Sequence, residues 1–288
     1  MDAVRRFLFE ALDIRGAIVT LGNTWHEMQA GRNDPPAIAT LLGEMTAIAA
    51  LIAGNLKTPG RLTFQLQGHG PVSLLLIDCD EQLRLRGTAR YADAVQNTRG
   101  EPADAVPPTP TFQELLGDGQ LVLTLHTNTG DPYQSIVPLV GDSIAAVFEH
   151  YLAQSEQQPA KLFLTASADF VGGLFLQRLP DANVKDPDGW NRIGHLAATL
   201  KPAELRQPIA NLLMQVFPEE DVRLFDPRPV RYHCPRDEDK VLGMLKQLGR
   251  AEIEATLAET GAVAVEDDIC RQQYRFGPEI IQRLFSEH

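Results

Sequence analysis

The sequence has 288 residues, of which 44% are hydrophobic, and this length and composition can bury a full core in about two domains. A formal net charge of −12 disfavours nucleic acid and anionic membrane surfaces as partners, because phosphate contacts need a basic face. Three cysteines do not make a secreted disulfide framework, and we find neither a secretory leader nor the roughly 18–20 apolar residues of a membrane span, so we expect a cytoplasmic protein.

Residues 1–180 predict a mixed α and β domain with a largely antiparallel sheet. A strand ends near Gly22, and apolar residues at helical spacing between Pro36 and Gly60 predict a long helix. Three strands follow up to residue 91, with turns at Gly68–Gly70 and at residues 78–81. The acidic cluster at 78–81 could hold a cation, but a solvated turn is the simpler interpretation.

The remainder of this first domain alternates strands with one further helix. Residues 97–119 are rich in proline and glycine and predict a surface excursion. Strands are expected at residues 120–128 and 132–140, then a helix with Asp142 as N-cap, then strands at 160–166 and 172–180. Strands in pairs with few long helices indicate an α+β fold.

Residues 181–230 have a different texture, with short amphipathic helical patches broken by prolines. We predict a helical linker whose apolar stripe must pack on another part of the chain. Residues 231–288 then predict a small α/β module, in which helices end at Gly249 and Gly261 before two short strands and a last helix. Because so short a module is only marginally stable alone, a metal or a crosslink there would add needed stability.

No pattern in the sequence indicates an enzyme. There is no Gly-x-Ser-x-Gly elbow, no phosphate-binding Walker loop and no His-Glu-x-x-His motif. Gly68-His69-Gly70 precedes a strand and therefore predicts a hairpin turn, and Cys79 ends an apolar strand as a buried, inert thiol.

Cys234 and Cys270 stand apart because each lies in a charged stretch of the C-terminal module, "YHCPRDEDK" and "EDDICRQQYRF". Each is placed like half of a metal-binding pair and lacks its other half. From the residues alone, a zinc site, a disulfide, a remnant of either and two unrelated thiols all remain open.

Several long segments resemble the heat shock protein 33 family, the redox-regulated 33 kDa chaperonins. The resemblance covers nearly the whole chain, including the linker with Trp190 and the C-terminal "LGRAEIEATL" and "YRFG". Its most specific segments are "LLGEMTAIAALIAGNLKTPGRLTFQLQGHGPVSLLLIDCDEQLRLRGTARY", "PYQSIVPLVGDSIAAVFEHYLAQSEQQPAKLFLTA" and "GGLFLQRLP".

The resemblance implies an ATP-independent holdase chaperone that captures unfolding client proteins under oxidative or heat stress, often as a dimer. It implies a client-binding domain (1–180), a linker folded onto it (181–230) and a redox module (231–288). In the family, that module binds zinc through Cys-x-Cys and Cys-x-x-Cys, and oxidation releases the zinc, forms a disulfide within each pair and unfolds the module.

This chain departs from the family pattern at both pairs. Cys234 matches the first cysteine of Cys-x-Cys, but Arg236 occupies the partner position, and arginine stays protonated and cannot ligate zinc. Cys270 matches the second cysteine of Cys-x-x-Cys, with Asp267 at the partner position, where a carboxylate can serve as a ligand. The ligands Cys234, Asp267 and Cys270 fall short of a full set, so zinc remains an alternative and a complete all-protein zinc site is not expected.

Two ways of holding the module without zinc follow. A Cys234–Cys270 disulfide would close a loop of about 37 residues, worth roughly 3–4 kcal/mol in the chain-entropy model, and oxidation would then staple the module shut instead of opening it. The module would alternatively be held by apolar packing alone, and heat would open it. The residues expected in that packing are Val241, Leu245, Leu248, Ile253, Leu257 and Tyr274.

The best candidates for client binding are the apolar residues of the linker stripe, because such surfaces are broad and adaptable. They are Trp190, Ile193, Leu196, Leu200, Leu212, Leu213 and Val216. The alternative function is a thiol-based redox or metal sensor that acts on one specific protein partner.

Overall fold

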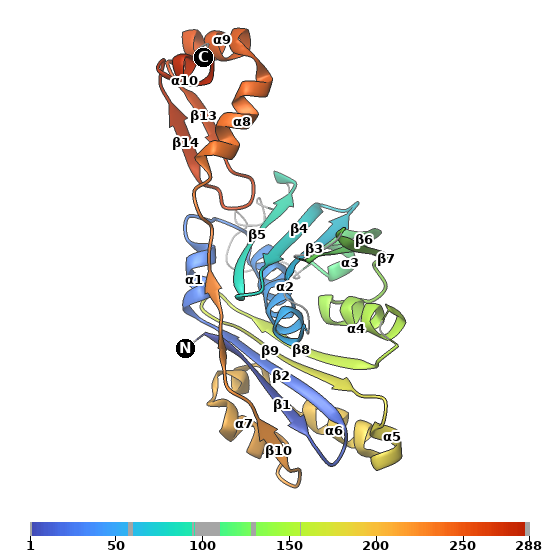
Figure 1. Ribbon diagram of the computed structural model, residues 1–288. Coiled ribbons are helices and arrows are strands. Elements are labelled where there is room, and N and C mark those ends of the chain that lie inside the picture. The colour runs from blue at the N-terminus through green and yellow to red at the C-terminus, as the bar shows by residue number, and fades with distance from the viewer. Residues whose placement is uncertain are drawn as a thin grey trace, which may run out of the picture. The chain divides into compact units, whose positions relative to one another are not determined.

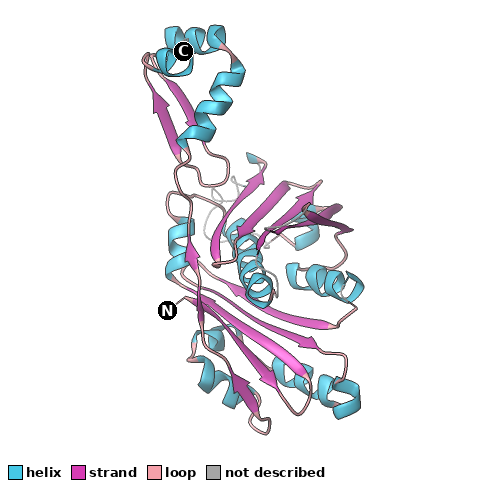
Figure 2. Ribbon diagram, viewed as in Figure 1, coloured by secondary structure: helices cyan, strands magenta, loops and turns pink. Residues whose placement is uncertain are grey.

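The computed structural model describes residues 2–56, 60–93, 95, 110–127, 131–155 and 157–285. The chain divides into two units, Met1–His233 and Cys234–His288. The first unit holds two β-sheets with helices packed on them, and the second holds a two-stranded sheet and helices (Figure 1). Figure 2 separates the two kinds of element by colour, and the α+β fold class is confirmed.

Sheet A and sheet B form the framework of the first unit, and nearly all their strand pairs are antiparallel. Sheet A has the order β10-β1-β2-β9-β8, made of β1 (Ala3–Phe9), β2 (Ile14–Leu21), β8 (Ala160–Ala166), β9 (Val171–Arg178) and β10 (Val222–Leu224); β11 (Arg228–Pro229) also pairs with β1. Sheet B has the order β12-β5-β4-β3-β6-β7, made of β3 (Gly60–Gly68), β4 (Val72–Cys79), β5 (Arg84–Tyr91), β6 (Gly119–Thr127), β7 (Tyr133–Pro138) and β12 (Arg231–Tyr232), the last parallel to β5.

The central helix α2 (Pro36–Asn55) packs against strands of both sheets (Figure 1). Its proline at the first helical position has the backbone angle a helix needs and gives up only an N–H that would lack a partner there. This helix is long and apolar enough to span a membrane, although we expected no such stretch. However, 72% of its most apolar segment is buried inside the protein. Most of this helix lies in the core between the two sheets, which explains why it is so apolar.

Shorter helices surround this core. They are α1 (Asn23–Gln29), α3 (Phe112–Leu116) and α4 (Ile144–Ser155). The N-terminus of α4 is capped by Ser143, whose hydroxyl accepts the Ala146 N–H at 3.2 Å, so the expected cap at Asp142 was one residue early. Of the expected surface excursion, residues 97–109 lie outside the described residues, and α3 forms within the remainder.

Sheet A carries apolar side chains on both faces, and the linker packs on one of these faces. Val4 and Val19 point into the main core with α2, whereas Phe7, Phe9 and Ile18 belong to a second core on the opposite face. That second face is covered by the segment that holds α5 (Ala182–Lys185), α6 (Gly189–Ala198), the 3₁₀ helix η2 (Pro202–Arg206) and α7 (Ile209–Val216). The chain then adds β10 and β11 to the edge of sheet A, so the region expected to be a helical linker ends in strands.

The expected turn at residues 78–81 is less solvated than the sequence indicated. Asp78 is 6% exposed on β4, where it accepts a hydrogen bond from the Thr63 hydroxyl at 2.7 Å and forms an ion pair with Arg86 at 2.8 Å. Asp80 accepts the backbone N–H groups of Gln82 and Arg84 and closes the turn. These acidic groups therefore stabilise the β4–β5 hairpin.

The second unit contains α8 (Glu238–Leu248), α9 (Arg250–Thr260), β13 (Val263–Glu266), β14 (Gln273–Phe276) and α10 (Ile280–Phe285). Asp237 caps α8, since its carboxylate accepts the Lys240 N–H at 3.0 Å. Gly249 and Gly261 end the two helices as expected, both with positive φ (90° and 75°), a region that favours glycine.

Candidate functional site

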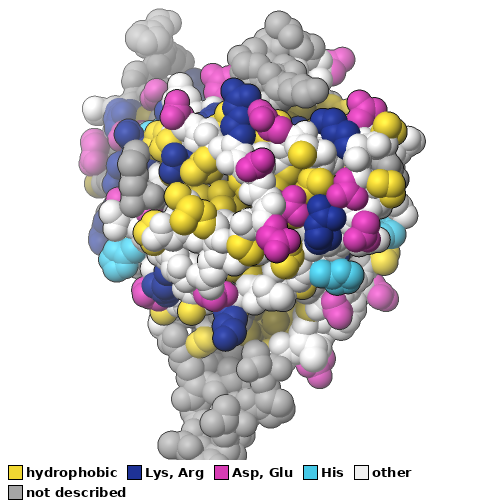
Figure 3. Space-filling view, turned by 90° about the horizontal axis from the view of Figure 1, so that it is seen from below, with side chains coloured by type: hydrophobic (Ala, Val, Ile, Leu, Met, Phe, Trp, Pro, Cys, Tyr) yellow, Lys and Arg dark blue, Asp and Glu magenta, His cyan; other side chains and the backbone are white. Residues whose placement is uncertain are grey.

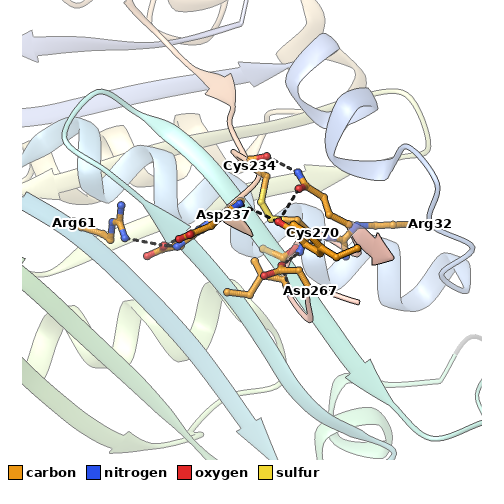
Figure 4. The surroundings of a disulfide bond; sticks show 12 residues. Arg32, Arg61, Cys234, Asp237, Asp267 and Cys270 are labelled. Carbon is orange, nitrogen blue, oxygen red and sulfur yellow. Dashed lines mark hydrogen bonds and ion pairs between the residues drawn. A yellow bond between two sulfur atoms is a disulfide. The ribbon is translucent and has the colours of Figure 1, made fainter. Parts of the chain in front are cut away.

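Cys234 and Cys270 are joined by a disulfide in the second unit (Figure 4). Their Cα atoms are 6.2 Å apart, inside the range of about 4.4–6.8 Å that disulfides span. Cys234 lies on the segment before α8, Cys270 on the turn between β13 and β14, and both are half-buried. The sequence alone did not decide whether these two cysteines act together, and the structure shows that they are neighbours in space.

Asp267 builds the turn that presents Cys270. Its carboxylate oxygen Oδ1 accepts the backbone N–H of Ile269 at 3.0 Å and that of Cys270 at 2.7 Å. The main chain adds two bonds, from Arg271 N–H to the Asp267 carbonyl and from Asp267 N–H to the Gln272 carbonyl. The carboxylate is thus a turn-forming group as well as a candidate ligand.

The same three residues form the one candidate metal group among the described residues. The ligand atoms of Cys234, Asp267 and Cys270 all lie within 4.8 Å of one another. A structural zinc site commonly takes four protein ligands, and this group supplies three donors, of which two are thiolates only when the disulfide is reduced. The donor set therefore fits zinc incompletely in the dithiol form and not at all in the disulfide form.

Arg236 takes a packing role at the position where a cysteine would complete the first pair. Its guanidinium lies over the ring of Tyr274, 4.6 Å from the ring centroid, and donates to the Gln273 carbonyl at 3.1 Å. Both contacts tie the segment before α8 to β14, so the substituted side chain fastens the module by means other than a metal.

A small hydrogen-bond network, independent of the disulfide, also joins the segment before α8 to the residues at the start of β14. Gln272 Nε2 donates to the Cys234 carbonyl at 2.6 Å, and the Asp237 N–H donates to the Tyr274 hydroxyl at 2.9 Å. The Tyr274 hydroxyl in turn donates to Gln272 Oε1 at 3.3 Å, and Tyr274 is only 3% exposed. Gln272 carries no local sequence signature for this role, because its partners are set by tertiary pairing.

The core of the second unit is small and partly as expected. Val241, Leu245, Ile253 and Tyr274 are buried together, and Leu257 packs at their edge. Leu248 is 59% exposed, so its expected place in the core was wrong. The core is completed, among the described residues, by Val263, Phe276, Ile280 and Leu284.

The seven linker residues expected to bind clients all lie in the second core of the first unit. Ile193, Leu212, Leu213 and Val216 are buried there, and Trp190, Leu196 and Leu200 pack against them half-buried. Seen from below, the surface of the first unit intersperses hydrophobic side chains with charges of both signs (Figure 3). The apolar stripe of the linker is thus turned inward, against sheet A.

Two arginine clusters lie at the surface of this linker, one that joins parts of the linker to each other and one that joins it to the residues before β9. Arg192 on α6 bridges Asp186 at 3.0 Å and Glu220 at 2.8 Å. Arg206 at the end of η2 pairs with Asp169 at 2.7 Å and stacks over Phe170, 4.5 Å from the ring centroid. The hydrogen bond from Arg206 lowers the pKa of Asp169 to about 2, so this contact is fully ionised near neutral pH.

Cys79 lies apart from this chemistry, as the sequence predicted. It is fully buried on β4, and burial raises the pKa of its thiol far above the ordinary value, so it stays protonated.

Three comparisons with known proteins agree. The Hsp33 protein family model matches residues 2–277. A 33 kDa chaperonin of Methylobacillus flagellatus is 35% identical and one of Neisseria gonorrhoeae is 36% identical; each alignment covers 99% of this chain, and 94% and 92% of those proteins. The crystal structure of a 33 kDa chaperonin from Thermotoga maritima superposes with a TM-score of 0.80 at 21% identity, over 99% of this chain and 98% of that one, which shows a shared fold.

Proposed function

This chain belongs to the Hsp33 family, and we propose that it is an ATP-independent holdase chaperone, which binds unfolding proteins and prevents their aggregation under heat or oxidative stress. It performs no chemical step on its clients. Its partners are unfolded or partly folded proteins, it acts in the cytoplasm and it forms a homodimer. Nucleic acid and membranes are not its partners, in keeping with its net charge of −12.

The observation that carries this proposal is the second apolar face of sheet A. Phe7, Phe9 and Ile18 on that face are at most 1% exposed only because the linker lies over them. Each such side chain contributes about 1.5–3 kcal/mol when it leaves water, so the uncovered face would bind any available apolar chain. Release of the linker therefore exposes two complementary apolar surfaces at once.

The division of labour follows from that observation. We assign client binding to residues 1–180, together with the inward stripe of the linker, residues 181–230, and we assign control to residues 231–288. The client-binding residues proposed in the linker are Trp190, Ile193, Leu196, Leu200, Leu212, Leu213 and Val216, all of which pack in the second core at rest.

The control module is a two-cysteine switch. Oxidation joins Cys234 to Cys270 and holds the module folded, whereas reduction leaves it to its small core and the Tyr274 network. Oxidation therefore has the opposite effect to that in a switch with two cysteine pairs, where the disulfide within each pair unfolds the module. Zinc at Cys234, Asp267 and Cys270 is the alternative fastening for the reduced module, with three protein donors.

The test is aggregation suppression by the full chain, measured by light scattering with two unrelated heat-unfolded clients. We expect suppression of both at near-stoichiometric ratios, unchanged by added ATP, and competition between the two clients for one surface. A protein that leaves both clients to aggregate would contradict the proposal.

A second function is favoured by the half-buried Cys234–Asp267–Cys270 group, which an oxidant or a metal ion can reach. In this case the chain is a thiol-based redox or metal sensor with one specific protein partner. Binding of a single saturable partner, with no suppression of unrelated clients, would decide for the sensor.

A further inference from the structure

A cavity of about 550 Å³ opens in the first unit where the linker crosses the end of sheet A. Its floor is formed by Ala3 and Arg5 of β1 and Thr20 of β2, and one wall by linker residues 206–209. Phe170 and Pro227 complete the apolar part of its lining. This volume lies within the range of about 300–1,000 Å³ typical of pockets for small molecules.

The two sides of the cavity belong to parts of the chain that separate if the linker is released. Ala3 and Arg5 stay on the sheet, whereas residues 206–209 join η2 to α7 and move with the linker. The cavity therefore exists in full only while the linker is docked. Any ligand that needs both sides binds the docked state and not the released one.

The charges in the cavity select the kind of ligand. Arg206 is engaged by Asp169 and Phe170, and the carboxylate of Asp2 accepts the N–H groups of Gly22 and Thr24. Arg5 donates its Nε to the Phe225 carbonyl at 2.9 Å, and the described residues offer its terminal nitrogens no further hydrogen bond or ion pair. The rest of the lining is mixed: Thr20 and Gln207 are polar, whereas Ala3, Phe170, Pro208, Ile209 and Pro227 are apolar. Arg5 thus has donors to spare beside apolar side chains, which complements a carboxylate on an apolar body.

We propose that this cavity is a regulatory site for a small amphipathic carboxylic acid, whose carboxylate pairs with Arg5 and whose apolar body lies between Phe170 and the linker wall at Pro208 and Ile209. Because the ligand binds only the docked state, it holds the linker on sheet A and opposes client capture. At a ligand concentration about 100 times its dissociation constant, the ratio of docked to released linker rises about 100-fold. The inhibitory half of this proposal rests on the proposed chaperone function, and the binding half does not.

The probe is octanoate, with octanol as its uncharged counterpart, and binding is measured by calorimetry on the full chain. We expect saturable binding of octanoate, at least about tenfold weaker binding in Arg5→Gln, and no change in Arg6→Gln, which removes a neighbouring exposed arginine outside the cavity. Octanol should bind the wild type more weakly and should not distinguish the two variants. Octanoate binding that is absent, or equal in Arg5→Gln and wild type, overturns the site.

Linker docking is followed separately, by the temperature at which proteases begin to cut within residues 199–209. Octanoate should raise that temperature in the wild type and in Arg6→Gln but not in Arg5→Gln, and should weaken aggregation suppression in the same pattern. An unchanged or lowered temperature, or stronger suppression with octanoate, overturns the docked-state assignment. If the protein suppresses no aggregation at all, the proposed function fails, while calorimetry and proteolysis still decide the site.

Discussion

The linker and the C-terminal unit are fastened in different ways. Within the described residues, the core shared by the linker and sheet A contains 16 buried side chains, whereas the core of the C-terminal unit contains eight and adds a disulfide. No disulfide in the described part of the chain joins the linker to the sheet that it covers. Packing, the pairing of β10 and β11 with β1, and surface ion pairs hold it in place, among them Arg206 with Asp169 and Arg223 with Glu10.

The difference shows where each region can be controlled. A segment held by noncovalent contacts alone is released when those contacts are lost, without any chemical change. A unit this short gains too little from its core to be stable alone with a wide margin, so a single crosslink decides its stability. We therefore expect redox conditions to act on the C-terminal unit and temperature to act on the linker.

The largest effect is expected from breaking the disulfide. Cys270→Ser, or reduction of the wild type, should lower the free energy of unfolding of the C-terminal unit by about 3–4 kcal/mol, because the closed loop of about 37 residues regains its freedom when unfolded. Denaturant titration followed by hydrogen exchange within residues 234–285 measures this. Aggregation suppression should be stronger in reduced than in oxidised protein.

The control is the double variant Cys234→Ser/Cys270→Ser, which retains only the buried Cys79 and should respond to neither reductant nor peroxide. Peroxide converts two thiols to a disulfide and is itself reduced to water. If peroxide strengthened chaperone activity in the wild type, the inverted switch would be ruled out and the comparison between the two regions would lose its basis.

The sequence predicts elements that carry their own pattern and misses those that depend on their surroundings. Helix α2 and strands β3–β5 follow from apolar periodicity with glycine and proline at the ends. Strand β1 was missed, because a strand covered on both faces lacks the alternation of a half-exposed one, and β10 is too short to show any pattern.

The candidate site follows the same rule. A Cys234–Cys270 disulfide was one of the expectations, and Leu245 was among the residues expected in the core of the module. Leu248 continues the same helical stripe, yet α8 ends there and the chain turns at Gly249, which leaves the side chain exposed. The hydrogen bond from Gln272 to the Cys234 carbonyl joins residues 38 positions apart, and no local pattern predicts it.

A smaller effect should follow from trimming the linker stripe. Leu212 is 1% exposed on α7, and Leu212→Ala should weaken linker docking by about 2–3 kcal/mol, at the lower end for buried leucines because a docked surface segment can settle into the gap. The variant should suppress aggregation at a lower temperature than the wild type. The temperature at which proteases cut within residues 199–209 reports docking directly.

Met214→Ala is the matched control for this change. Met214 lies on the same helix but is 68% exposed, so its removal should alter neither docking nor activity. If both variants behaved alike, the stripe would not be what holds the linker, and the contrast between packing and crosslink would fail on the linker side.

The smallest effect is expected from the Arg206–Asp169 contact, and it depends on pH. The hydrogen bond that Arg206 donates lowers the pKa of Asp169 from 3.8 to about 2, so the folded protein favours the ionised carboxylate. The stabilisation is complete above pH 3.8 and is lost as the pH falls through about 2. Because the pair is exposed, screening by water keeps the effect modest.

In the Arg206→Gln variant the linker should therefore dock slightly less tightly at neutral pH. The difference in docking from the wild type should shrink as the pH falls from about 4 to about 2. Proteolysis by pepsin within residues 199–209 follows docking across that range. A difference that stayed constant down to pH 2 would mean that Arg206 acts by stacking on Phe170 and not through Asp169, since the stacked ring does not titrate. The linker would then be fastened by packing even at its surface, which would sharpen its contrast with the crosslinked unit.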